Sequence, residues 1–188
     1  MAVEDGMKEI RIHGRGGQGA VTAVRILAAA FVREGKWASG FPAFGMERRG
    51  APVMAFARFD DKPVREKTKV YNPDCIVVID SRLISSADLV EGVKPDGILV
   101  LNTAEQVKEQ PHENIGLIGS VDATRIGLEE VGIAVTNTCM LGAFARATEW
   151  IEVSSLLASL GEFFSRDMLK RNRRCVERGF EETECVTF

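Results

Sequence analysis

A run of glycines near the amino terminus constrains the fold more than any other feature of the sequence. The segment from Lys8 to His13 alternates polar and apolar residues at a period of two, which predicts a strand, and Gly-Arg-Gly-Gly-Gln-Gly follows at 14–19. Apolar residues then recur at helical spacing as far as Glu34-Gly35, at Ala20, Val24, Leu27, Ala28 and Phe31. A strand, a tight loop and a helix in this order are typical of α/β folds.

The glycine loop consists of Gly14, Arg15, Gly16, Gly17, Gln18 and Gly19. It fits the pattern G-x-G-x-x-G, in which backbone N–H groups at a helix N-terminus can receive a phosphate. Residues without a Cβ let a ligand approach the backbone, but they also permit a tight turn with close helix packing, and both interpretations stay open. Binding of NAD would require an acidic residue at the end of a second strand, about 20 residues further on. Because Glu34 lies at the helix end instead, ordinary dinucleotide binding is disfavoured.

A second unusual segment occupies residues 37–52, where glycines and prolines are too frequent for a regular element and predict a long loop. It carries Glu47, Arg48, Arg49 and Gly50. Guanidinium groups suit phosphates and carboxylates. For this segment taken alone, however, a solvated cluster of charges is the favoured interpretation.

The rest of the chain alternates short apolar runs with helical patterns. A strand at 53–59, turned back at 60–63 toward Val64, predicts a hairpin and hence a mixed sheet. Further strands are expected at 76–79, 98–101 and 115–121, and helices at 83–90, 123–131, 137–150, from 154 onward and at 167–178. The expected fold is α/β and three-layered, with a mostly parallel or mixed sheet, a Rossmann-like glycine loop, C-terminal helices and a single domain over residues 1–188.

Composition and charge exclude several classes of function. A net charge of −3 provides no positive field for nucleic acid, and no apolar run approaches the ~20 residues of a membrane span. The first residues lack the basic and apolar regions of a signal peptide, so a cytoplasmic protein is expected. Cys75, Cys139, Cys175 and Cys185 have no CxxC spacing, and we expect this chain to hold neither an iron–sulfur cluster nor zinc.

The sequence contains no self-sufficient active site. Its two histidines, His13 and His112, are far apart, and neither a nucleophile elbow nor a Walker lysine is present. Asp80 and Asp122 follow predicted strands, where α/β sites form, but no partner base or metal set is recognisable. The basic helix around Arg166 to Arg178 is interrupted by acids, which favours a solvated or subunit-facing surface.

Three segments together resemble a known family. They are GRGGQG at 14–19, FPAFGMERRGAPV at 41–53 and NTCMLGAFARA at 137–147, the last followed by a Leu/Phe-rich helix. The chain resembles, from about residue 10 to 164, the gamma subunit of pyruvate:ferredoxin oxidoreductase and its 2-oxoacid relatives. Gly45, Glu47, Arg49 and Gly50 match the family's second loop, although Ala51 stands where many relatives have glycine.

The resemblance implies a subunit of an enzyme that converts a 2-oxoacid and coenzyme A to acyl-CoA and CO2 while reducing ferredoxin. Pyruvate is the first expectation, with 2-oxoisovalerate, 2-oxoglutarate and indolepyruvate as alternatives. Thiamine diphosphate, magnesium and 4Fe-4S clusters are expected in the alpha, beta and delta subunits, and ferredoxin is expected to interact through the complex. The two loops are expected either to bind coenzyme A or to pair with the alpha subunit. A nucleotide-binding or redox-sensing module and a ligand-free scaffold remain alternatives.

Overall fold

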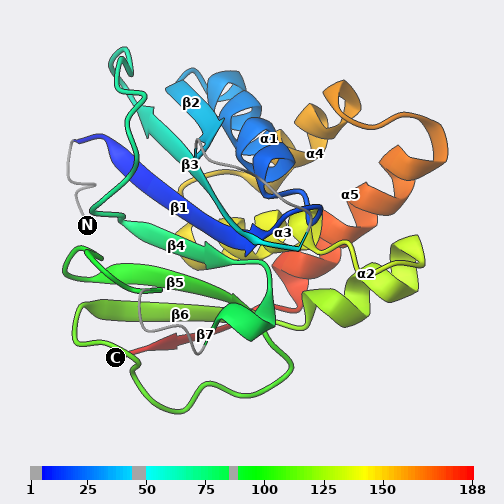
Figure 1. Ribbon diagram of the computed structural model, residues 1–188. Helices are drawn as coiled ribbons and strands as arrows, with labels where there is room; N and C mark the ends of the chain where they lie inside the picture. The colour runs from blue at the N-terminus through cyan, green and yellow to red at the C-terminus, as the bar shows by residue number, and fades with distance from the viewer. Residues whose placement is uncertain (1–5, 44–49, 85–88) are drawn as a thin grey trace.

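A seven-stranded sheet forms the centre of the protein, as described by a computed structural model of residues 6–43, 50–84 and 89–188 (Figure 1). Across the sheet the order is β2-β3-β1-β4-β5-β6-β7. The strands are β1 (Lys8–Arg15), β2 (Trp37–Pro42), β3 (Pro52–Asp60), β4 (Cys75–Val78), β5 (Gly97–Asn102), β6 (Ile115–Val121) and β7 (Glu184–Thr187).

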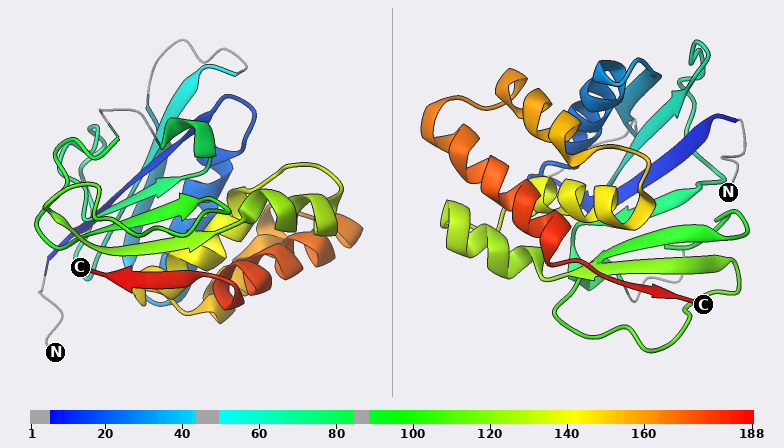
Figure 2. Two further views of the ribbon diagram at one scale, coloured as in Figure 1. Left: turned by 90° about the horizontal axis from the view of Figure 1, so that it is seen from below. Right: turned by 180° about the vertical axis from the view of Figure 1, so that it is seen from behind.

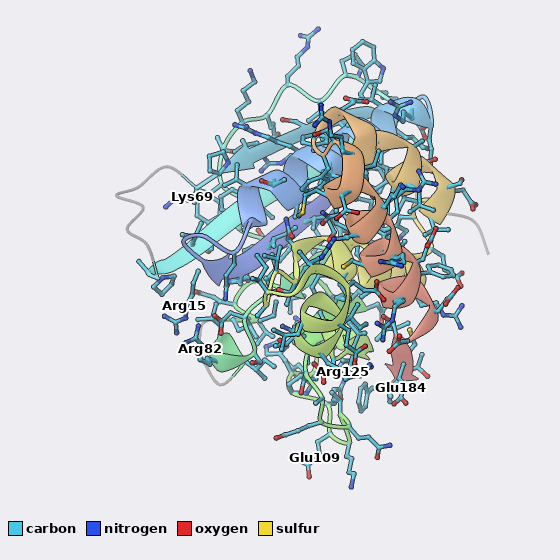
Figure 3. All side chains as sticks on the ribbon, turned by 90° about the vertical axis from the view of Figure 1, so that its right-hand side faces the viewer. Arg15, Lys69, Arg82, Glu109, Arg125 and Glu184 are labelled. Carbon is cyan, nitrogen blue, oxygen red and sulfur yellow. The ribbon has the colours of Figure 1, made fainter. Side chains whose placement is uncertain are left out.

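The sheet is mixed, as the sequence predicts. Strands β1, β4, β5 and β6 are parallel, whereas β3 runs antiparallel to both β1 and β2, and β7 runs antiparallel to β6. The carboxyl ends of the four parallel strands therefore share one edge, which faces the viewer in Figure 3. In open α/β sheets, ligands bind at this edge.

All five α-helices cover one face of the sheet (Figure 2). They are α1 (Ala20–Arg33), α2 (Ala123–Val131), α3 (Asn137–Thr148), α4 (Val153–Ser159) and α5 (Arg166–Glu181), with single 3₁₀ turns at η1 (Ser81–Leu83) and η2 (Leu160–Glu162). The opposite face is covered by connecting segments, from which Leu89, Val93 and Val107 pack onto the strands. Among the described residues, the third layer thus consists of loops and the single 3₁₀ turn η1 rather than of α-helices.

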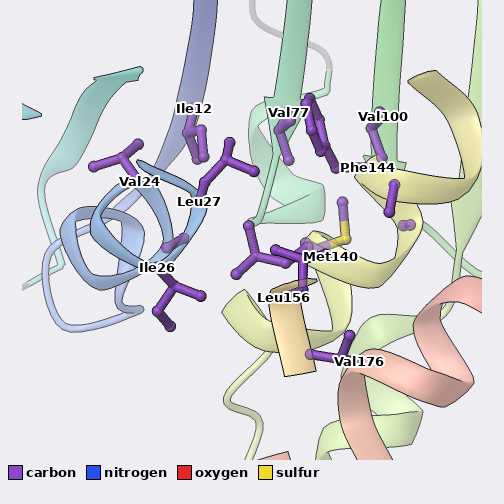
Figure 4. Packing of buried hydrophobic residues seen from close by; sticks show 14 of the residues in the cluster. Ile12, Val24, Ile26, Leu27, Val77, Val100, Met140, Phe144, Leu156 and Val176 are labelled. Carbon is purple, nitrogen blue, oxygen red and sulfur yellow. The ribbon is translucent and has the colours of Figure 1, made fainter. Parts of the chain in front are cut away.

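Alternation along the strands divides the core between the two faces. Ile10 and Ile12 of β1 and Val77 of β4 belong to a large cluster under the helices, part of which is drawn in Figure 4. Ile76 and Val78 of β4 belong to a smaller cluster under the loops. Each fully buried Ile, Leu or Phe contributes roughly 1.5–3 kcal/mol relative to an exposed side chain, so the helix-covered face holds most of the stability.

Helices α3 and α5 touch through two glycines. A Cβ on Gly142 would collide with the backbone carbonyl of Val176, and a Cβ on Gly179 would collide with the carbonyl of Cys139. Glycine in a helix costs about 1 kcal/mol relative to alanine. Close backbone packing explains why it is present at both positions.

The segment at 37–52 is not a long loop throughout, because Trp37–Pro42 forms the edge strand β2. The residues that suggest irregularity have structural reasons: a Cβ on Gly40 would collide with the carbonyl of Val24 in α1, and a proline is tolerated in an edge strand. The expected hairpin toward Val64 is likewise wrong, because β3 pairs with β2 and β1. The turn at 60–63 leads instead into irregular chain.

Most other predicted elements are confirmed to within a few residues. The helix expected at 83–90 is not observed in its described part, where only η1 and turns occur. Strand β7 is not among the strands that the sequence predicts. It pairs with β6 beyond the end of α5, so a tertiary contact determines its structure.

Among the described residues, we find no helix with the length and apolar character that crossing a lipid bilayer requires.

Candidate functional site

The glycine loop connects the carboxyl end of β1 to the first turn of α1. Gly17 and Gly19 adopt φ angles of +94° and +79°, which favour glycine strongly. Gly19 precedes α1 without supplying a side-chain cap. The first-turn N–H groups, which have no partner within a helix, therefore point toward the edge of the sheet where ligands bind in this fold class.

Gln18 ties the glycine loop to the neighbouring strand. Its side-chain carbonyl accepts a hydrogen bond of 2.7 Å from the backbone N–H of Arg15. Its amide nitrogen donates to the carboxylate of Asp80, at 2.6 Å, just beyond the end of β4. The side chain of Gln18 therefore links the start of the glycine loop, at Arg15, to the end of the neighbouring strand, at Asp80.

Asp80 is the electrostatic centre of this edge. It is only 4% exposed, and it accepts hydrogen bonds from the backbone N–H, Nε and Nη2 of Arg82 at 3.0, 2.9 and 2.6 Å. Arg15 adds an ion pair, with Nε at 3.4 Å from Oδ2. The hydrogen bonds from Arg82 and Gln18 outweigh burial and lower the pKa of Asp80 to about 2. The carboxylate therefore stays ionised at neutral pH and holds two arginines beside the glycine loop, as Figure 3 shows for Arg15 and Arg82.

Gly50 and Ala51, at the end of the second unusual segment, form hydrogen bonds with the glycine loop. The N–H of Gly16 donates to the carbonyl of Ala51 at 2.9 Å, and the N–H of Gly50 donates to the carbonyl of Gly16 at 3.1 Å. Nη1 of Arg15 also donates to the carbonyl of Gly50 at 3.1 Å. Of the predicted site residues, the structure therefore brings Gly50 against the glycine loop. Glu47, Arg48 and Arg49, together with Gly45, lie outside the described residues.

The N-terminus of α3 contacts the end of the glycine loop through Asn137. The side-chain amide of Asn137 donates to the carbonyl of Gly19 at 3.3 Å, and a Cβ on Gly19 would lie 2.5 Å from that amide nitrogen. The other side-chain atom, Oδ1 of Asn137, is buried without a hydrogen-bond partner. The sequence predicts Asn137 only as the start of a helix, which agrees with the first residue of α3, and not as a residue of the site. Its position within the third family-like segment was the available signal.

Asp80 also lines a small cavity of about 220 Å³. Asn102 at the end of β5 helps to shape it, since its amide nitrogen donates to the carbonyl of Ile79 at 2.8 Å and contacts the hydroxyl of Thr124 at 3.0 Å. Its walls also include Gln18 and Arg82. The sequence indicates Asp80 by its position after a predicted strand, but it does not identify the side chains that bind Asp80. The partners are distant in sequence or, like Arg82, look like ordinary surface charges.

The arrangement differs from a dinucleotide-binding site in one decisive way. In that fold class a second parallel strand beside β1 presents the acid that holds the ribose. Here the neighbour of β1 on that side is β3, which runs antiparallel and presents Pro52 opposite Arg15. The described site therefore has glycines and cations suited to an anion, without the ribose-binding carboxylate.

Three of the six basic residues of α5 form ion pairs with acids. Arg178 contacts Glu129, Glu130 and Glu182 at 2.7–3.0 Å. Arg174 contacts Glu130, and Arg171 contacts Asp167, both at 2.7 Å. The pairs with Glu129 and Glu130 fit a helix that packs on α2.

The described residues contain no group of three or more histidine, cysteine or acidic side chains placed to hold a metal ion. Cys75, Cys139 and Cys175 are buried, and Cys185 is exposed. Burial raises the pKa of Cys175 to about 11, so its thiol is protonated at neutral pH.

Comparison with known proteins places this fold and loop pair in one family. The family model for pyruvate ferredoxin/flavodoxin oxidoreductase matches residues 9–182. The "Pyruvate/ketoisovalerate oxidoreductases common subunit gamma" of Thermococcus kodakarensis is 48% identical over 180 residues, covering 94% of this chain and 97% of that protein. "Pyruvate synthase subunit PorC" of Methanothermobacter thermautotrophicus is 46% identical over 178 residues, covering 95% and 97%.

A solved structure shows the same architecture. The pyruvate oxidoreductase subunit PORC of Thermotoga maritima superposes with a TM-score of 0.83 at 40% identity, covering 96% of this chain and 98% of that one.

The chain belongs to the pyruvate ferredoxin/flavodoxin oxidoreductase family. The resemblance to the gamma subunit is confirmed, as is the expectation that the chain is part of an enzyme.

Proposed function

We propose that this chain is the gamma subunit of a pyruvate synthase and that its two loops position coenzyme A in the assembled enzyme. Relatives covered almost end to end carry pyruvate synthase or pyruvate/ketoisovalerate oxidoreductase in their names. Because one gamma subunit of Thermococcus kodakarensis is named as common to two oxidoreductases, we infer that a chain of this kind does not determine which 2-oxoacid is used. The same role with 2-oxoisovalerate is therefore the second candidate.

The observation that carries the coenzyme A proposal is the contact between the glycine loop and Gly50. Beside this contact lie the uncapped N-terminus of α1 and two arginines, Arg15 and Arg82, which are both paired with the ionised carboxylate of Asp80. Two cations against one anion leave a net positive charge, which suits the phosphates of coenzyme A. Arg48 and Arg49 would add further cations on the second loop.

The remaining cofactors are proposed to belong to partner chains. Thiamine diphosphate with magnesium and the 4Fe-4S clusters would be held by alpha, beta and delta subunits, and ferredoxin would be reduced through the complex. The described residues of this chain offer no cysteine set for a cluster, which supports that division. We place the complex in the cytoplasm, and we propose one folded domain for the gamma chain.

Steady-state kinetics of the assembled enzyme test the coenzyme A role. In the variants Arg15→Met and Arg49→Ala, we expect the KM for coenzyme A to rise about tenfold or more, while the KM for the 2-oxoacid and the thiamine content stay unchanged. Arg25→Met is the matched control, because Arg25 is an exposed arginine on α1. An unaltered KM in intact complexes of both variants would contradict the phosphate role. Failure of the variants to assemble would favour pairing with the alpha subunit.

A further inference from the structure

A second cavity, of about 430 Å³, lies on the loop-covered face of the sheet, away from the helices. Its floor is a square of side chains from two antiparallel strands: His13 of β1 lies opposite Met54 of β3, and Arg11 lies opposite Phe56. The walls are supplied by Lys69, Val70 and Tyr71 on one stretch of chain and by Leu83, Leu89 and Glu91 on another. Typical ligand pockets measure roughly 300–1,000 Å³, so this cavity has room for a small organic molecule.

Arg11 makes no direct ion pair among the described residues, although the Glu91 carboxylate acts on it from a greater distance and favours its charged form. Two residues away along β1, on the same face of the sheet, Glu9 lies opposite Arg58 and accepts a hydrogen bond of 2.8 Å from its Nε. Arg11 is only 7% exposed, and its Nη2 donates to the carbonyls of Leu89 and Glu91 at 3.1 and 2.7 Å. Among the described residues no carboxylate lies within 4.0 Å of it, and its Nε is buried without a partner. A buried cation of this kind is costly unless an anion compensates it.

The other lining groups favour a singly charged ligand. Lys69 is exposed at the cavity, and Glu91 supplies the one carboxylate. Burial lowers the pKa of His13 to about 4, so its imidazole is neutral at pH 7. Two cations and one anion leave one positive charge. Nε2 of His13 is also buried without a hydrogen-bond partner, which leaves a polar group of the floor unused.

Large apolar surface is exposed at the same cavity. Met54 is 37% exposed and Tyr71 is 70% exposed, and both line it together with Leu83 and Leu89. Exposed apolar groups gathered around an unbalanced charge are typical of a binding pocket rather than of ordinary surface.

We propose that this cavity binds a monocarboxylate with an apolar body. The carboxylate lies by Lys69 in the field of the Arg11 guanidinium below it. The apolar body lies on Met54 between Tyr71 and Leu83. The ligand would sit beside the paired loops, since Gly14 and Pro52 form the adjoining wall. The cavity shares Gly14 with the glycine loop, but its charged groups, Arg11, Lys69 and Glu91, are not among those proposed to position coenzyme A.

Isothermal titration of the full chain with 4-phenylbutyrate tests this proposal. We expect one site per chain with a Kd below about 1 mM. Met54→Trp, which fills the cavity from a partly exposed position, should weaken binding at least tenfold, and Lys69→Met at least threefold. Met168→Trp is the matched control, because Met168 is 43% exposed on the distant helix α5 and should leave binding unchanged.

A second measurement follows the imidazole itself. The chain has two histidines, so the NMR signals of His13 and His112 can be assigned with the variant His112→Gln. Saturating 4-phenylbutyrate should raise the pKa of His13, because a nearby anion favours the charged imidazole, and should leave His112 unaffected. Absence of binding, equal binding to Met54→Trp, or equal binding of the neutral 4-phenyl-1-butanol would overturn the proposal. Binding to the isolated chain but not to the assembled complex would also overturn it, in favour of a partner segment in the cavity.

Discussion

The side-chain amide of Gln18 donates a hydrogen bond of 2.6 Å to the carboxylate of Asp80, and this contact joins the glycine loop to the end of β4. The same side chain accepts from the N–H of Arg15. Asp80 in turn binds Arg82 and lies near Arg15, so one glutamine organises both cations of the proposed anion site.

Replacing Gln18 by leucine should destabilise the chain. The substitution removes two hydrogen bonds and leaves the N–H of Arg15 without its acceptor, which costs roughly 1–3 kcal/mol. Urea unfolding of the purified chain measures the free energy of unfolding. Gln106→Leu, at an exposed position, serves as the control and should change it by less than about 0.5 kcal/mol. Equal effects of the two substitutions would contradict the organising role of Gln18.

At Gly142, where α3 packs on α5, we expect alanine to lower the free energy of unfolding, although helix propensity alone would raise it. Propensity alone would make Gly142→Ala stabilising by about 1 kcal/mol. Because the new Cβ meets the carbonyl of Val176, we expect a loss of about 1–3 kcal/mol instead. Gly161→Ala, where nothing lies within 4 Å of the added Cβ, should be close to neutral. Thermal unfolding of both variants against wild type measures the difference, and a stabilised Gly142→Ala would refute the packing.

Two features restrict position 19 to glycine: the backbone has a φ of +79°, and an added Cβ would collide with the side chain of Asn137. Gly35→Ala introduces alanine at a similar φ of +81° in open space, so it isolates the backbone strain. Gly19→Ala adds the clash with Asn137, and it should therefore cost more free energy of unfolding than Gly35→Ala. In the assembled enzyme, Gly19→Ala should also raise the KM for coenzyme A, whereas Gly35→Ala should not. Identical behaviour of the two variants in both assays would contradict the assigned geometry.

His13 makes stability depend on pH in a defined window. Its pKa in the folded chain is lowered to about 4, mainly by burial and further by Arg11, against about 6.5 when unfolded. Between these values the unfolded state binds more protons, so stability falls as the pH falls from about 6.5 to about 4, by on the order of 2–3 kcal/mol. Asp80 acts the same way only between about pH 4 and pH 2.

Urea unfolding at pH 4.5–7.5 therefore isolates the contribution of His13. We expect His13→Phe to flatten the dependence on pH, while His112→Gln leaves it in place. An unchanged slope in His13→Phe would mean that other groups cause the dependence.

The parts of the fold predicted from sequence are those set by local pattern. The alternation in β1, the helical spacing in α1 and the buried runs of β4 and β5 each specify one element, and each is observed. The errors fall where tertiary contacts decide. Gly40 looks like a loop residue until α1 is packed on it, and β7 exists only because β6 offers an edge.

In the candidate site, too, the part with a local sequence pattern was predictable and the part formed by tertiary contacts was not. The glycine loop was identifiable from its residues, because positive φ angles and a following helix restrict the choice of amino acid. Its supports, Asp80, Arg82 and Asn137, are separated from it by more than 60 residues of chain and carry no local signature. Only the folded arrangement shows that they surround one loop.

Anaerobic purification of the tagged chain from its native host tests whether it works as one subunit of a larger oxidoreductase. We predict that the chain co-purifies with larger subunits that carry thiamine diphosphate and iron–sulfur chromophores, and that the complex oxidises pyruvate only when coenzyme A is present. Recovery of a stable lone monomer, with no associated chains or chromophores, would contradict the account.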